Sequence, residues 1–323
     1  MLIFALSESA AFSERIAKEL GLSLSQIEER SFPDGEFQAR PLVSVRGRDV
    51  YVIQSLHAGP EASIGDKLTR LLLFLATARD NGAQRVTAVI PYLAFARQDR
   101  RVHPHDPLAL RSLALVLEAV GVDAVVTMDV HNIAAFENAF RCCTVNLEAG
   151  PNFARKAIEM GLDEPVVVAS PDLGGAKRAQ AFGAVLKQAR GGPVGLAYME
   201  KQRLDSGALA GTEFAGDVAG AHVLVIDDMI STGTTLVRAA KACHDRGARR
   251  IQAFATHGLF SGDAGNALMQ AGLEKIVTSN SMPPFRLTGL PASQLVETVD
   301  VAPLFAEAIR RLHENRSLDD VSG

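Results

Sequence analysis

Two adjacent carboxylates, Asp227 and Asp228, directly follow the apolar residues 223–226. A run of this kind, rich in β-branched side chains, predicts a buried strand. The composition of residues 236–246 predicts a helix that Gly247 ends. Between the acids and this helix lies a run of hydroxyl residues and glycine: Ser231, Thr232, Gly233, Thr234 and Thr235.

The chemistry of this segment follows from its place between a strand and a helix. At a helix N-terminus the backbone N–H groups lack partners and the helix dipole is positive. A loop of Ser, Thr and Gly at that place can bind a phosphate group. Ser and Thr also cap helices that bind nothing, and acids end many parallel strands. The acidic pair beside the loop favours a ligand with hydroxyl groups or a metal on one side and phosphate on the other, as in a sugar phosphate.

Three other segments carry residues that can bind or react. Pro-Asp-Gly within residues 32–36 is a strong turn signal and by itself predicts a hairpin. A polar loop that contains Arg97 follows the predicted strand 86–90, at the end where open α/β sheets bind ligands. Asp129 and His131 follow the next predicted strand. Two residues apart on an extended chain, they project to the same face and suit a divalent ion or its hydration shell, or they simply end the strand.

A flexible basic segment is predicted around residue 201. The predicted strand 195–199 leads to Lys201 and Arg203, and residues 204–220 are rich in Gly and Ala with little periodicity. That pattern predicts a mobile excursion. Such a loop is often inert surface, but it can also bring positive charge onto a substrate after binding.

Length and composition limit the class of protein. A chain of 323 residues predicts two domains, and 47% hydrophobic with 22% charged residues is typical of a globular protein with ample core. The net charge of −4 gives no electrostatic reason to expect nucleic acid or an anionic membrane, so phosphate binding must be local. Three cysteines without metal or redox spacing, and no apolar window of membrane-spanning length, predict a reduced, cytoplasmic protein.

The order of elements predicts a duplicated α/β fold. Strands alternate with helices throughout, which indicates parallel sheets. Residues 81–95 and 246–260 resemble one another, as do residues 121–128 and 272–279, and both pairs lie about half the chain length apart. In the first copy, residues 50–53 correspond to the strand 223–226, but Gln54 and Ser55 follow it in place of the two acids. We therefore expect the first copy to have lost the phosphate loop and to bind a different ligand.

Six segments in order resemble the ribose-phosphate pyrophosphokinase (phosphoribosyl pyrophosphate synthetase) family over nearly the whole chain. They are FPDGE, VIPYLAFARQDRR with the later DPL, VVTMDVH, VVVASPDLGGAKRAQAF, MEKQR and VLVIDDMISTGTTL. The resemblance implies a tandem of two type I phosphoribosyltransferase-like domains, each a mostly parallel sheet flanked by helices. It implies boundaries at 1–148, with residues 301–323 packed back on that domain, and 149–300. The implied reaction moves the pyrophosphoryl group of Mg-ATP to the anomeric hydroxyl of ribose 5-phosphate, giving phosphoribosyl pyrophosphate and AMP.

The resemblance also implies roles for the site residues. Asp227 and Asp228 would hold the ribose hydroxyls and residues 231–235 the 5-phosphate, while Lys201 and Arg203 would neutralise charge on the transferred group, with Arg203 also contacting ribose 5-phosphate. ATP would be bound by Arg97, Gln98 and Asp99, together with Phe32, Asp34, Gly35 and Glu36 from a neighbouring subunit. His131 would hold Mg²⁺, with Asp129 as an alternative ligand, and Asp172 would contact ribose or a second metal-bound water. A dimer-based homo-oligomer such as a hexamer is implied.

The sequence departs from the family pattern at some of these places. Ser231 and Thr234 stand where many members carry Asp and a second Gly, Glu200 replaces an Asp, and residues 132–140 differ from the usual segment. Ser still offers a hydroxyl donor, so phosphate binding should survive. Two other hypotheses stay open: a non-catalytic regulatory relative that binds nucleotides, and a base phosphoribosyltransferase, which shares the 223–236 unit.

Overall fold

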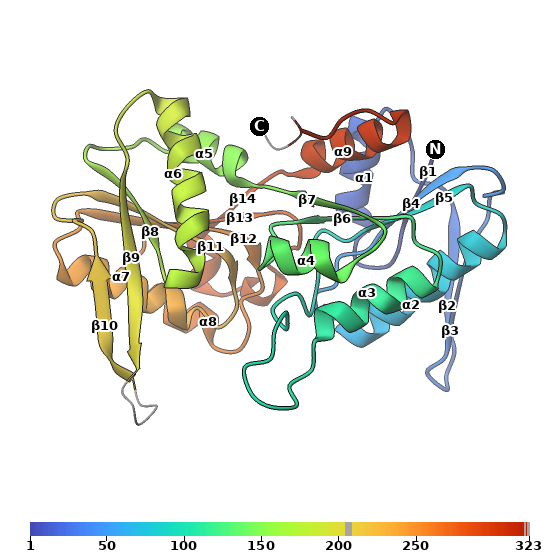
Figure 1. Cartoon of the computed structure of the whole chain (residues 1–323), viewed down its shortest axis with the longest axis horizontal. Helices are drawn as coiled ribbons and strands as arrows, with labels where there is room; N and C mark the ends of the chain where they lie inside the picture. Colours follow the sequence, from blue (N-terminus) through green and yellow to red (C-terminus); the bar gives the residue numbers. More distant parts are fainter. Residues whose placement is uncertain (204–208, 320, 322–323) are drawn as a thin grey trace. The chain divides into compact units, whose positions relative to one another are not determined.

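The chain folds into two α/β units, each with its own central sheet. Residues 1–148 and 302–323 form the first unit, and residues 149–301 form the second; Figure 1 labels their helices and strands. The computed structural model describes the backbone of residues 1–203, 209–319 and 321, and the side chains of these ranges except residues 200–213.

The first unit is built on a five-stranded parallel sheet in the order β1-β4-β5-β6-β7. The strands of this sheet are β1 (Leu2–Ala5), β4 (Asp49–Ile53), β5 (Arg85–Val89), β6 (Ala124–Met128) and β7 (Cys143–Leu147), and its helices are α1 (Ala10–Glu19), α2 (Ile64–Asp80), α3 (Ala109–Ala119), α4 (Ile133–Ala139) and α9 (Ala302–Glu314). Helices lie on both faces of the sheet (Figure 1). The inner strands β4, β5 and β6 are therefore largely apolar, and every residue of β6 is buried.

The C-terminal helix α9 returns to the first unit. It packs on α1, where the rings of Phe12 and Phe305 meet edge to face with centroids 5.5 Å apart. His313 Nδ1 lies 2.8 Å from Asp49 Oδ2, and Arg85 Nε donates to Asp49 Oδ1 at 2.9 Å. A side chain of β5 and one of the C-terminal helix thus share one carboxylate at the start of β4.

A separate two-stranded antiparallel sheet also belongs to the first unit. It consists of β2 (Ile27–Ser31) and β3 (Phe37–Pro41), joined by the turn 32–36. Gly35 adopts φ 93°, a conformation that other residues rarely take, which explains glycine at this position of the turn. The predicted hairpin is confirmed.

The second unit is built on a seven-stranded sheet in the order β10-β9-β8-β11-β12-β13-β14. All neighbours are parallel except β9 and β10, which run antiparallel. The strands are β8 (Val166–Ser170), β9 (Gly195–Arg203), β10 (Leu209–Ala215), β11 (His222–Ile230), β12 (Arg250–Gly258), β13 (Lys275–Ser279) and β14 (Val296–Val299). The helices are α5 (Gly150–Glu159), α6 (Ala176–Arg190), α7 (Thr234–Asp245) and α8 (Ala264–Met269), with the short 3₁₀ helices η1 (Leu173–Gly175), η2 (Phe285–Leu287) and η3 (Pro291–Leu295).

The two sheets repeat one strand order. The series β1-β4-β5-β6-β7 in the first unit corresponds to β8-β11-β12-β13-β14 in the second. Residues 50–53 and 223–226, which the sequence pairs with one another, lie in β4 and β11, the second strand of each series. The predicted duplication is confirmed, with β9 and β10 added at one edge of the second sheet.

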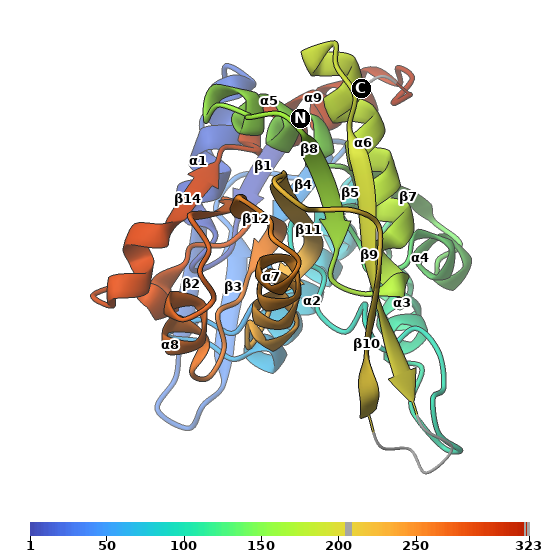
Figure 2. The same ribbon diagram turned by 90° about the vertical axis from the view of Figure 1, so that its left-hand side faces the viewer.

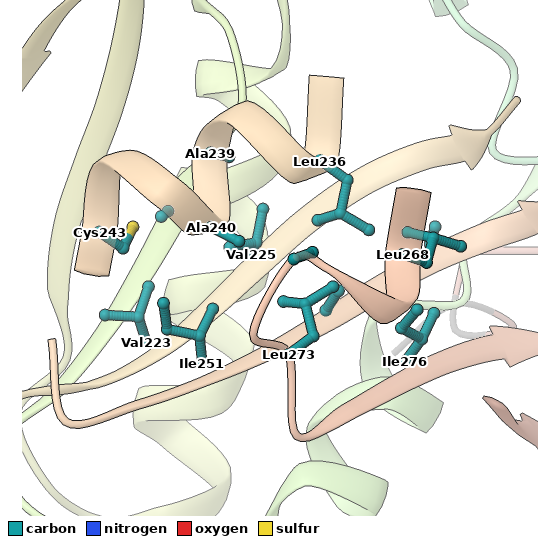
Figure 3. Packing of buried hydrophobic residues seen from close by; sticks show 14 of the residues in the cluster. Val223, Val225, Leu236, Ala239, Ala240, Cys243, Ile251, Leu268, Leu273 and Ile276 are labelled. Atoms are coloured by element: carbon teal, nitrogen blue, oxygen red, sulfur yellow. The ribbon is translucent and has the colours of Figure 1, made fainter. Parts of the chain in front are cut away.

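A hydrophobic cluster holds α7 against the second sheet (Figure 3). Residues three and four apart in a helix share one face, and Leu236, Ala239 and Cys243 turn this face of α7 toward β11. There they pack with Val223 and Val225, in a cluster that also includes side chains of β12, α8 and β13. This core fixes the start of α7 directly after the end of β11.

The structure corrects two predicted elements of the second unit. Residues 209–215 form β10, hydrogen-bonded along β9, where the sequence predicts an excursion without regular structure (Figure 2). A further strand that the sequence pattern does not indicate, β14, pairs with β13 at the other edge of the sheet. Both strands lie at sheet edges, where alternating or Gly-rich segments carry little apolar signal. No helix in the described part of the chain is long and apolar enough to cross a membrane.

Candidate functional site

The predicted acidic pair lies near the carboxyl end of β11. The side chain of Asp227 is 25% exposed, and that of Asp228 is 5% exposed. Because β8, β11 and β12 run parallel, the loops that follow them leave the same edge of the sheet. Open α/β sheets bind their ligands at this edge.

Arg178, in the first turn of α6, contacts both carboxylates. Its Nη1 lies 3.4 Å from Asp227 Oδ1 and 3.7 Å from Asp228 Oδ1. The backbone N–H of Asp228 also donates to Asp227 Oδ1 at 2.9 Å. Sequence reasoning missed Arg178 because it lies 49 positions before Asp227 and looks like an ordinary polar residue of a helix. The only signal was its place inside the segment 166–182 that carries the family resemblance.

The pair is electrostatically costly. Burial raises the pKa of Asp227 well above its ordinary value, and the neighbouring charge of Asp228 raises it further. Arg178 lowers the pKa of Asp227 and so favours the ionised form. Two carboxylates held together with one guanidinium are typical of sites that bind or react.

Residues 231–233 of the predicted phosphate loop connect β11 to α7, and Thr234 and Thr235 begin the helix. Gly233 adopts φ 77° at the N-cap, and a Cβ there would lie 3.3 Å from the side chain of Leu268, so the position suits glycine. Ser261 N–H donates to Ser231 O at 2.8 Å and ties the loop to the segment after β12. The loop therefore has one fixed conformation at the start of the helix.

The donors of this loop remain available for a ligand. Among the described residues, the backbone N–H groups of residues 232–235 have no acceptor. The hydroxyl oxygens of Thr232 and Thr234 lie 3.0 Å apart, and both residues are exposed. Together with the positive end of the α7 dipole, groups of this kind can bind an anion.

Asp172 lies in the loop after β8, the strand beside β11. Its Oδ1 accepts from the N–H of Gly175 at 3.0 Å and caps η1, and its carbonyl oxygen accepts from Ser170 Oγ at 2.6 Å. The carboxylate therefore orders its own loop at the edge of the sheet where the loop 231–235 also lies.

Lys201 and Arg203 lie in β9. The backbone of Lys201 pairs with Thr212 of β10, and Arg203 pairs with Leu209. Their side chains lie outside the described part of the structure. The backbone places both residues on a β-hairpin, where the sequence predicts a loop.

In the first unit, the residues predicted to bind ATP follow β5. Arg97 and Gln98 are exposed, and Asp99 is half-buried. Asp99 Oδ2 accepts from Asn132 Nδ2 at 2.6 Å, and Asn132 also caps α4 by accepting from the N–H of Ala135. This contact brings the loop after β5 to the loop after β6, which contains His131. Nothing in the sequence pattern indicated Asn132.

The backbone near His131 differs from the predicted geometry. Asp129 has φ 41°, so residues 129–131 are not an extended chain, and the argument that Asp129 and His131 share one face fails. No group of three His, Cys, Asp or Glu side chains among the described residues is arranged to hold a metal ion. Mg²⁺ usually keeps several waters and takes one or two carboxylates with substrate phosphates.

The predicted adenine contact lies at the tip of the β2–β3 hairpin. Phe32 is 41% exposed, and its N–H donates to the carbonyl of Glu36 at 2.8 Å. Asp34 Oδ1 accepts from the N–H of Glu36 at 3.1 Å. The turn thus presents an aromatic ring and two acids to solvent in a fixed arrangement.

Comparison with known proteins identifies the family. Residues 1–121 match the N-terminal domain of ribose phosphate pyrophosphokinase, and residues 209–321 match the phosphoribosyl synthetase-associated domain. The chain is 36% identical over 319 residues to a ribose-phosphate pyrophosphokinase of Vibrio parahaemolyticus, with 98% of each chain covered. The chain belongs to the ribose-phosphate pyrophosphokinase family. A pyrophosphokinase of Caldanaerobacter subterraneus is also 36% identical, over 98% of this chain and 96% of the relative.

A solved structure extends the likeness from sequence to fold. The crystal structure of phosphoribosylpyrophosphate synthetase from Mycobacterium smegmatis superposes with a TM-score of 0.87 at 29% identity and covers 97% of this chain and 99% of its own. The predicted resemblance to the pyrophosphokinase family and the predicted tandem of two type I phosphoribosyltransferase-like domains are confirmed. As a member of the ribose-phosphate pyrophosphokinase family, the chain is an enzyme. The roles of its individual site residues stay predictions.

Proposed function

We propose that the chain transfers the pyrophosphoryl group of Mg-ATP to the anomeric hydroxyl of ribose 5-phosphate, giving 5-phosphoribosyl 1-pyrophosphate and AMP. The observation that carries the proposal is the acidic pair Asp227 and Asp228 next to the open loop 231–235. A phosphorylated pentose has hydroxyl groups that can donate to the two carboxylates and a phosphate dianion that can bind to the loop. Relatives named for this activity, similar over nearly the whole chain, support the choice of substrates.

The second unit would bind and orient ribose 5-phosphate. Asp227 and Asp228 would accept hydrogen bonds from the 2- and 3-hydroxyls, and the N–H groups and hydroxyls of residues 231–235 would donate to the 5-phosphate. Arg178 would favour the ionised form of Asp227, which accepts hydrogen bonds more strongly than the neutral acid. Lys201 and Arg203 would neutralise charge on the transferred group. Contacts of this kind typically contribute about 3–4 kcal/mol to a transition state.

The first unit would bind ATP, which is the role that the family resemblance implies for it. Arg97, Gln98 and Asp99 would contact the nucleotide, and Phe32 with the acids of its turn would complete a site in a neighbouring subunit. His131 would hold Mg²⁺ with the triphosphate, with Asp129 as an alternative ligand, and Asp172 would contact the ribose or a second metal-bound water. The ion would neutralise phosphate charge when bound. A dimer-based homo-oligomer, such as a hexamer, in the cytoplasm is part of this proposal.

The reaction needs little covalent chemistry from the protein. The anomeric oxygen forms a bond to the β-phosphorus, and the bond from that phosphorus to the oxygen bridging to the α-phosphorus breaks. AMP leaves with the bridging oxygen, and the hydroxyl proton passes to solvent. Phosphoryl-type transfers depend mainly on positioning and electrostatic stabilisation, so no strong general base is required.

One assay tests the proposal. The purified chain should form AMP from ATP only when ribose 5-phosphate and Mg²⁺ are both present. Lys201→Ala should keep ribose 5-phosphate binding and lose turnover, whereas Lys187→Ala, at an exposed position of α6, should leave both unchanged. Nucleotide binding without AMP formation would instead indicate a regulatory relative. Consumption of phosphoribosyl pyrophosphate that depends on a purine or pyrimidine base would indicate a base phosphoribosyltransferase.

A further inference from the structure

The β2–β3 hairpin has no hydrophobic core of its own. It is a two-stranded sheet hydrogen-bonded to neither of the large sheets, and no residue from 27 to 41 is buried. Isolated two-stranded hairpins are marginally stable in water. Contacts with the rest of the first unit must therefore hold the tip of the hairpin, which carries Phe32, Asp34 and Glu36, in a fixed position.

The register of the hairpin gives it two chemically different faces. Ser31 pairs with Phe37, and Glu29 pairs with Ala39, so these four side chains lie on one face. The other face carries Glu28, whose carboxylate contacts Arg30 at 3.1 Å and Arg40 at 2.6 Å. That ion-pair network lies within the hairpin, whereas the first face carries residues that contact the rest of the unit.

One side chain of α2 contacts three residues of the first face. The Nη2 of Arg70 donates to Ser31 Oγ at 3.1 Å, and its Nη1 lies 3.8 Å from Glu29 Oε1. The guanidinium also lies over the ring of Phe37, with Cζ 4.5 Å from the centroid. Arg70 is only 18% exposed, so water weakens these contacts less than it would on an open surface.

Glu29 connects the same contact to the central sheet. Its Oε2 accepts from the N–H of Ser7 at 3.0 Å, and its Oε1 accepts from Ser7 Oγ at 3.0 Å. Ser7 follows β1 directly. The hairpin is thus attached to a helix through Arg70 and to the end of a strand through Glu29, next to the turn that faces solvent.

We propose that Arg70 is a positioning residue for nucleotide binding. It holds the last residue pair of the β2–β3 hairpin against α2 and thereby fixes the turn 32–36. This role rests on the proposed function, in which that turn contacts ATP. Arg70 itself does not touch the substrate. Its loss acts through the hairpin and leaves the pentose site of the second unit unchanged.

The test combines a structural and a kinetic measurement on the full-length enzyme. In Arg70→Met, amide hydrogen exchange of residues 27–41 should accelerate, and the KM for ATP should rise roughly 3- to 30-fold, which corresponds to the loss of one cation–π contact and one partly exposed ion pair. The KM for ribose 5-phosphate should not change. Arg70→Lys keeps the charge but loses the planar group, and it should give a smaller change of the same kind. Lys18→Met removes an exposed cation of α1 and should behave like the unaltered enzyme.

The outcomes separate this inference from the proposed function. Unchanged exchange of the hairpin in Arg70→Met would overturn the anchoring role. Faster exchange with an unchanged KM for ATP would overturn the link to nucleotide binding. If the unaltered chain forms no AMP while Arg70→Met accelerates exchange in the hairpin, the anchoring role is supported and the proposed function fails.

Discussion

Replacing Arg178 by Met should weaken the use of ribose 5-phosphate and change its pH dependence. The guanidinium is close to both carboxylates of the pair and lowers the pKa of Asp227. Without it the pKa of Asp227 rises further, because the guanidinium charge no longer opposes the effects of burial and of the Asp228 charge. Asp227 is therefore protonated at a higher pH in Arg178→Met. The acidic limb of the profile of kcat/KM for ribose 5-phosphate should move upward.

The size of the effect follows from the distances. At 3.4 and 3.7 Å, Coulomb's law with an effective dielectric constant of ~20 gives about 4–5 kcal/mol for each carboxylate before solvation is counted. Arg178 and Asp227 are each about a quarter exposed, so desolvation costs and screening leave a net contribution on the order of 1–2 kcal/mol. This corresponds to a loss of roughly 5- to 30-fold in kcat/KM for ribose 5-phosphate at neutral pH.

The measurement is the rate of AMP formation at limiting ribose 5-phosphate, across the neutral pH range. Lys187→Met is the matched control, since it removes an exposed cation from the same helix, away from the pair. Arg178→Lys should restore part of the acidic limb because the charge is kept. A profile for Arg178→Met that coincides with the control would refute the reasoning, as would an equal loss that appears only in the KM for ATP.

Three further substitutions test the energetics of single residues. Asp227→Asn should abolish turnover and raise the free energy of unfolding at neutral pH by roughly 0.5–2 kcal/mol. Because the pKa of Asp227 is raised in the folded state, ionisation of this group lowers the free energy of unfolding as the pH rises above the ordinary pKa of an Asp side chain. The gain in Asp227→Asn should therefore vanish in acid, where Asp227 is protonated in both the folded and the unfolded state. Equal urea midpoints for the variant and the unaltered chain at neutral pH would contradict this prediction. Gly233→Ala should cost about 1–2 kcal/mol, because φ is 77° there, and should weaken ribose 5-phosphate binding measured by calorimetry. Lys67→Met should lower the free energy of unfolding by about 3–5 kcal/mol, since it leaves the carboxylate of Glu8 without its fully buried partner, and unaltered thermal unfolding would count against this pair.

Local patterns in the sequence were sufficient to predict several strands and the part of the candidate site that lies in the second unit. Apolar runs predicted β4, β5, β6 and β11, because strands covered on both faces are mostly apolar. The acids and the hydroxyl loop lie within 14 consecutive positions, 223–236, so one strand–loop–helix unit was enough to place them together. The duplicated order of strands could also be predicted, because residues 81–95 and 121–128 of the first copy resemble residues 246–260 and 272–279 of the second.

Contacts between distant segments could not be predicted from these patterns. The sequence contains no signal that Arg178 reaches Asp227 from another helix, that Arg70 holds a hairpin some 40 positions earlier, or that Asp129 turns into a left-handed conformation. Such contacts depend on which loops leave the same edge of a sheet and on which faces pack together. The sequence by itself determined the fold and the chemical groups of residues 227–235, which we propose bind the pentose. Only the tertiary structure decided which cation lies beside the acids and what holds the turn 32–36, because charge and packing at a point in space come from side chains that are remote along the chain.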